Sequence, residues 1–157
     1  MPCSLGPLEQ GVCLNLTPQA VEGGIGVGFQ IVENVVSDPC DETSMPDPPV
    51  GPSVDDLVAA ISNLPGFEAT PAEDVTVDGF EGKRFTVTAP DVAGCALQVW
   101  ATSSRVNGVS PGEVNLLYVV DVEGVRVMIS SAYFPAQVRE EDLAAAEEVI
   151  ASIEIEP

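Results

Sequence analysis

The four cysteines are the residues of this sequence best suited to covalent or metal chemistry: Cys3, Cys13, Cys40 and Cys95. The chain has no histidine, and no C-x-x-C pair is present, so the closely spaced ligand pairs of a structural zinc site are missing. An even number of cysteines without metal-binding spacing favours disulfides over a metal site. Of the three pairings, we favour a short loop closed by Cys3 and Cys13, and a Cys40–Cys95 bond that ties an irregular segment to a strand. Four unpaired buried thiols are the alternative.

Residues able to act as a nucleophile or as an acid–base pair are present, but they lack partners. The hydroxyls near Ser103 and Ser130 have no histidine to activate them, and Lys83, the only lysine, lies in an expected surface hairpin. Glu140 and Glu141 are paired carboxylates of the kind that glycosidases use, but their place at a helix start already explains them. We therefore expect no catalytic residues.

An acidic segment offers the hard oxygen ligands that Ca²⁺ prefers. The segment covers residues 37–52, is rich in proline and lacks hydrophobic periodicity, so it is predicted to be a loop. It has no EF-hand spacing, and we favour a solvated loop over calcium binding. No other cofactor is indicated. The candidate calcium ligands are Asp38, Asp41, Glu42 and Asp47.

Trp100 is the second candidate for ligand binding. It falls in the expected strand 95–102, where strict alternation places it on the same side as Gln98 and opposite Leu97 and Val99. On that side, Trp100 and Gln98 would form a platform on which a ligand stacks. Packing of the indole in the core, beneath a helix, is the alternative that we favour.

The charge of the chain limits its partners. Twenty-five acidic residues against five basic ones give a formal net charge of −20. Such a charge repels phosphate groups, which excludes ordinary nucleic-acid binding, and it concentrates cations and cationic partners near the surface. No apolar run approaches the roughly 20 residues that a membrane span needs.

The elements that must position these residues begin with two helices. Residues 53–64 carry one apolar stripe at helical spacing. Ser53 is suited to the N-cap, and the acidic side chains of Asp55 and Asp56 favour the positive end of a helix. A second helix is predicted over residues 138–151.

The remaining patterned segments predict strands. The run at 114–120 is apolar without alternation, which predicts a strand covered on both faces. Residues 103–112 are predicted to be a polar loop, and residues 78–82 a hairpin connection. Strands that outnumber helices and do not alternate with them indicate an α+β fold, an antiparallel β-sheet flanked by two main helices. The expected strands are 11–16, 25–36, 74–77, 83–89, 95–102, 114–120, 125–133 and 153–156.

Six blocks of the sequence carry a resemblance: DPC (38–40), PPVGPSVDDLVAA (48–60), VTVDGFEGK (75–83), YVVDVEGVR (118–126), YFP (133–135) and SIEIEP (152–157). In this order they resemble a largely uncharacterised group of bacterial secreted or membrane-anchored α+β domains. The resemblance covers most of residues 25–157 and implies export, a Cys40–Cys95 pair and no catalytic residues. A looser, fold-level similarity to the PsbP/Mog1-like sandwich says little about function.

Together these observations predict an irregular N-terminal arm, residues 1–24, followed by a single domain, residues 25–157. Oxidised cysteines predict a location outside the cytoplasm, and we expect a mature ectodomain carried by a larger parent protein or a lipid anchor. The expected function is that of a non-catalytic module that binds or senses a small molecule or contacts another protein. A structural subunit of an extracellular assembly is the alternative, and a weak hydrolase that uses carboxylates is a second.

Overall fold

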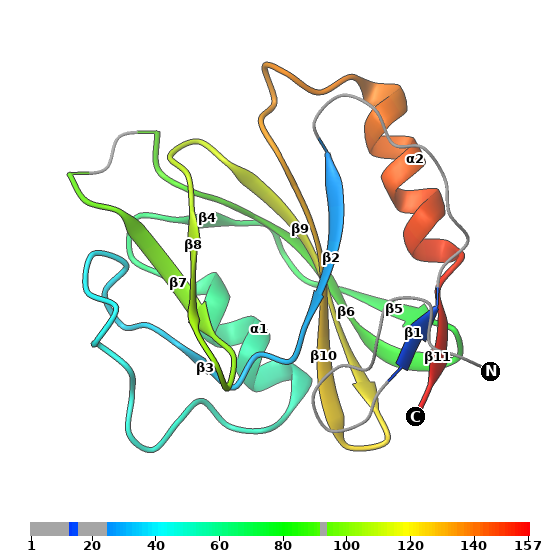
Figure 1. Ribbon diagram of the computed structural model, residues 1–157, viewed down its shortest axis with the longest axis horizontal. Coiled ribbons are helices and arrows are strands. Elements are labelled where there is room, and N and C mark those ends of the chain that lie inside the picture. Colours follow the sequence, from blue (N-terminus) through cyan, green and yellow to red (C-terminus); the bar gives the residue numbers. More distant parts are fainter. Residues whose placement is uncertain (1–12, 16–24, 92–93) are drawn as a thin grey trace.

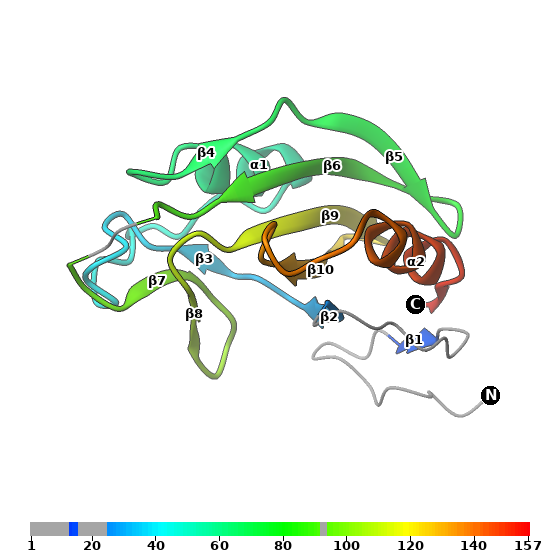
Figure 2. The same cartoon turned by 90° about the horizontal axis from the view of Figure 1, so that it is seen from above.

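A six-stranded antiparallel sheet lies at the centre of the computed structural model, which describes residues 25–91 and 94–157 and the backbone of 13–15. The strands follow the order β2-β10-β9-β6-β4, and β5 pairs with β6 on the same edge as β4. Figure 2 shows this order from β5 at one side to β2 at the other. The strands are β2 (Gly26–Gln30), β4 (Glu68–Ala69), β5 (Glu73–Val77), β6 (Phe80–Thr88), β9 (Val114–Val122) and β10 (Val125–Tyr133).

Two tight turns fix the register of this sheet. Asp78 and Gly79 connect β5 to β6, and Glu123 and Gly124 connect β9 to β10, all four with positive φ. Turns of this kind match the right-handed twist of the strands that they join. The predicted connection at 78–82 is therefore too long, because β6 already begins at Phe80.

Each face of the sheet has its own apolar core and its own helix. Helix α1 (Val54–Ser62) packs with Leu117 and Val119 on one face, and α2 (Glu140–Ala151) packs with Val120 and Val122 on the other. Every residue of β9 except Asp121 is buried, which confirms that this strand is covered on both sides. The fold is thus α+β, an antiparallel sheet with helices.

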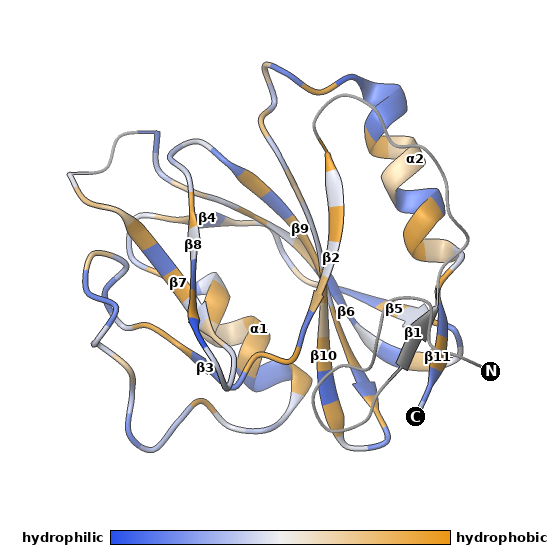
Figure 3. Ribbon diagram, viewed as in Figure 1, coloured by the Kyte–Doolittle hydropathy of each residue, from blue (hydrophilic) through white to orange (hydrophobic). Residues whose placement is uncertain are grey.

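The helix starts are set by local hydrogen bonds. Ser53 Oγ accepts from the backbone N–H of Asp56 at 3.0 Å, and Asp56 Oδ2 accepts from the backbone N–H of Ser53 at 3.0 Å. This capping box confirms the predicted start of α1. The first turn of α2 carries Glu140, Glu141 and Asp142, and Figure 3 shows this end of the helix as hydrophilic (blue).

The expected strand 25–36 is wrong as a single element. Its first part is β2 in the central sheet, whereas its second part, β3 (Asn34–Val35), pairs with β7 (Leu97–Ala101) in a separate sheet. The third strand of that sheet, β8 (Val106–Val109), lies inside the expected loop 103–112. The sequence does not predict β8 because Asn107 and Gly108 are both unfavourable in strands. Glycine is needed at position 108, however, because a Cβ there would lie 2.9 Å from the carbonyl oxygen of Leu97. The two-residue strand β4 is exposed, and the sequence pattern does not predict it either.

The expected strands near the two ends of the chain pair with each other. β1 (Cys13–Asn15) runs antiparallel to β11 (Glu154–Glu156). β1 is therefore a regular element inside the segment expected to be an irregular arm. The rest of residues 1–24, including Cys3, lies outside the described residues, so the expected Cys3–Cys13 bond stays a prediction.

Candidate functional site

The disulfide between Cys40 and Cys95 is present and joins the loop before α1 to the segment before β7. Nearby, the backbone N–H of Gln98 donates to the carbonyl of Pro39 at 2.8 Å. The covalent bond and this hydrogen bond hold the proline-rich loop against the small sheet. The predicted pairing of these two cysteines is confirmed.

The structure does not bring the four expected calcium ligands together. Asp38 Oδ1 accepts from the backbone N–H of Cys40 at 2.9 Å, and Asp41 Oδ1 accepts from the backbone and hydroxyl of Thr43. The hydrogen bonds from Thr43 lower the pKa of Asp41. These carboxylates therefore shape their own turns, while Glu42 and Asp47 are exposed. Within residues 25–91 and 94–157, no three His, Cys, Asp or Glu side chains are placed to hold a metal ion.

Trp100 packs in the core on the α1 side of the sheet. Its side chain is 3% exposed, and Nε1 donates to Gln30 Oε1 at 3.0 Å. A bulge between Gln98 and Trp100 breaks the alternation of β7, so that Val99 and Trp100 both enter the same core cluster. Trp100 therefore packs in the core, as in the alternative that we favour from the sequence, and the buried indole leaves little surface on which a ligand could stack.

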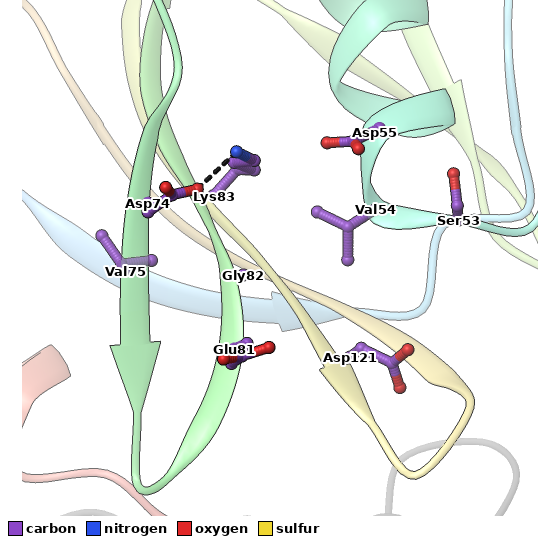
Figure 4. Close-up of a pocket in the computed structure, with 9 residues that line it drawn as sticks. All are labelled: Ser53, Val54, Asp55, Asp74, Val75, Glu81, Gly82, Lys83 and Asp121. Carbon is purple, nitrogen blue, oxygen red and sulfur yellow. Dashed lines mark hydrogen bonds and ion pairs between the residues drawn. The ribbon is translucent and has the colours of Figure 1, made fainter.

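A cleft lies between the start of α1 and the β5–β6 hairpin. Its volume is about 520 Å³, and the end of β9 closes one side. Figure 4 shows the hairpin residues facing the first turn of α1 across the opening. The lining residues are Ser53, Val54, Asp55, Asp74, Val75, Glu81, Gly82, Lys83 and Asp121.

The charges of this acidic cleft are strongly unbalanced. Four carboxylates line it against a single ammonium group, that of Lys83. Lys83 Nζ forms an ion pair with Asp74, and this hydrogen bond, followed by the charges of Asp74 and Asp55, raises the pKa of Lys83. The lysine is thereby held in its charged form, and Asp55, Glu81 and Asp121 leave the cleft with net negative charge.

Arg126 on β10 positions the wall of the acidic cleft that α1 provides. Its guanidinium donates to the carbonyls of Gly51, Ser53 and Val32, the latter two at 2.9 and 3.0 Å. A side chain at residue 51 would collide with the Asp56 carboxylate, since a Cβ there would lie 2.4 Å from Oδ2. Glycine at this position and the arginine therefore fix where α1 begins, and with it Asp55.

Sequence reasoning did not find the acidic cleft. The sequence places Asp55 at a helix start beside the acidic loop, and Asp74, Glu81 and Asp121 are not among the expected site residues. The available signal was the Asp-Gly turn, which places Asp74 opposite Lys83 in a two-residue hairpin. The carboxylates considered for hydrolysis lie elsewhere, in the first turn of α2, where Glu141 pairs with Arg139 at 3.0 Å.

The chain matches no family model, and searches of curated proteins and of solved structures gave no significant match. No helix in the described parts of the chain is long and apolar enough to cross a membrane.

Proposed function

We propose that this protein is a non-catalytic binding module that works outside the cytoplasm and holds a cationic group in the acidic cleft. The observation that carries the proposal is a concave site of about 520 Å³ whose lining has four carboxylates and one lysine already paired with Asp74. Concave sites with a few convergent polar groups are the usual places where proteins bind ligands. The surrounding negative charge would raise the local concentration of a cationic ligand.

The proposed location follows from the disulfide. Cysteine pairs persist in oxidising compartments and are rare in the cytosol, where thiols are kept reduced. The Cys40–Cys95 bond closes a loop across 55 residues. This supports the secreted or membrane-anchored setting that the sequence resemblance implies.

We also propose that the fold is a variant of the PsbP/Mog1-like sandwich. An antiparallel sheet with one helix against each face supports this, because flanking helices on such a sheet are what the similarity implies. A shared fold would not by itself assign a ligand. The functional proposal therefore depends on the cleft.

The test uses spermidine as a cationic probe at constant ionic strength. Spermidine is expected to raise the melting temperature of the protein by binding the folded state. The double variant Asp55→Asn, Glu81→Gln should show a clearly smaller rise. Glu42→Gln with Asp47→Asn is the matched control, because it removes the same charge from an exposed loop and should behave as the parent protein does. Equal shifts in all three proteins would mean general screening and would overturn the proposal.

A further inference from the structure

Strand β5 lies at an open edge of the central sheet. In the described part of the chain it pairs with β6 alone, and β4 occupies a different stretch of the same edge. An edge strand presents unpaired backbone groups that can accept another strand. Figure 2 shows β5 on the outside of the sheet, beyond β6.

The register identifies the unpaired groups. The two-residue turn makes Val77 and Phe80 the pair that closes the hairpin, and hydrogen-bonded pairs then alternate along an antiparallel ladder. Val75 and Glu73 therefore direct their backbone groups toward β6, whereas Asp74 and Thr76 direct theirs outward. No backbone hydrogen bond from another described segment reaches these two residues.

The side chains beside this edge select the charge of an added strand. Asp74 faces Lys83 across the hairpin, so its side chain lies on the face of the sheet that carries the acidic cleft. Alternate residues of a strand placed next to β5 would lie beside Asp74 and over the cleft, because directly opposed side chains approach to about 5 Å. Lysine or arginine at those alternate positions would be attracted by Asp55, Glu81 and Asp121.

The same charges disfavour a second copy of this chain as the occupant. β5 carries Glu73 and Asp74, and the whole chain has a net charge of −20. Pairing two β5 edges would bring the Glu73 and Asp74 side chains of both copies to the same edge, and the repulsion between like charges on neighbouring strands opposes this pairing. Acidic residues on the edge therefore oppose self-association and remain attractive to a basic segment.

We propose that the free edge of β5 binds an extended basic segment of a partner protein, which adds to the sheet as a further strand. Its alternate lysine or arginine side chains enter the acidic cleft, and its backbone pairs with Asp74 and Thr76. This inference rests on the proposed function and names the class of ligand that the cleft takes. Backbone pairing gives affinity in this mode of recognition, and alternate side chains give specificity.

The experiment uses the full chain and a capped peptide of four Thr-Lys repeats. Amide hydrogen exchange at Asp74 and Thr76 should slow when this peptide binds. A block peptide of the same composition, four threonines followed by four lysines, should bind about tenfold more weakly, because an extended strand of it places only two lysines on the cleft face, whereas the alternating peptide places four. A peptide N-methylated at alternate residues keeps its charge but loses backbone donors, and it should show the same loss.

Two variants of the protein separate backbone pairing from charge. Thr76→Pro removes an outward N–H at a position where an edge strand tolerates proline, and it should weaken the Thr-Lys peptide but leave spermidine binding unchanged. Lys83→Met frees Asp74 and should strengthen peptide binding. Equal affinity for alternating, block and N-methylated peptides would overturn strand addition while the cationic cleft stands. If neither spermidine nor any peptide binds, the proposed function fails as well.

Discussion

Replacing Cys40 and Cys95 by serine is expected to lower the free energy of unfolding by about 4 kcal/mol. The bond closes a loop across 55 residues, for which the chain-entropy relation gives about 4 kcal/mol at 25 °C. The loop contains α1 and strands β4 to β6, so the cross-link restricts a large part of the unfolded chain. Native-state losses should be small, because Cys40 is exposed and Cys95 half-buried.

Urea unfolding followed by tryptophan fluorescence measures this effect directly. Trp100 is the only tryptophan and is 3% exposed, so its emission reports loss of the core. The serine variant should have a lower midpoint and a larger dependence on urea, because its unfolded state is more expanded. Reducing the parent protein before unfolding should lower its midpoint at least as far as the variant's, because reduction also breaks the predicted Cys3–Cys13 bond.

Two results would refute this reasoning. A loss smaller than about 1 kcal/mol would mean that the unfolded chain gains little freedom when the bond is removed. An unchanged urea dependence with a large loss would place the effect in the folded state instead.

Peptide mapping without reductant checks the remaining pair, since a Cys3–Cys13 peptide would confirm the predicted short loop.

Two further predictions concern the start of α1. Arg126→Met removes the donors to the carbonyls of Gly51 and Ser53, and it should lower the free energy of unfolding in urea by about 2–4 kcal/mol. Arg126→Lys should restore part of this loss. An unchanged urea midpoint would contradict the positioning role of the arginine. Hydrogen bonds from the side chain and backbone of Ser53 lower the pKa of Asp56 in the folded protein. The stability that Asp56 contributes is therefore fully present above its unfolded pKa of about 3.9, and it is lost as the pH falls through the lower folded pKa. Asp56→Asn should therefore lower the melting temperature at neutral pH and converge with the parent protein in acid. Asp47→Asn, which makes the same change in net charge in an exposed loop, is the matched control.

Local patterns predicted the elements that local forces determine. The apolar stripe and capping residues located α1, because each depends on residues within a few positions of one another. The run without alternation located β9 as a doubly covered strand. The pairing of Cys40 with Cys95 was also among the alternatives that the sequence allowed.

The features that the sequence does not predict depend on contacts between distant segments of the chain. The bulge at Val99 places Trp100 in the core and cannot be inferred from strict alternation along the strand. The division of residues 25–36 between two sheets depends on which partner each half finds, β10 or β7. The acidic cleft combines carboxylates from α1, β5, β6 and β9, so no window of the sequence contains it.

Three segments that lie far apart in the sequence, residues 53–55, 74–83 and 121, meet around the acidic cleft. Part of this arrangement has a structural explanation, since Arg126 donates to the backbone carbonyl of Gly51, and Asp121 Oδ1 accepts from the N–H of Gly124 in its own turn. Glu81 is different, because it is exposed at the cleft and stands opposite Thr76 without an ion pair among the described residues. Packing and turn chemistry thus account for the arginine, the glycine and Asp121, but not for a carboxylate at position 81. A cationic ligand would account for it, which is why the cleft variant pairs Asp55 with Glu81 and leaves Asp121 intact.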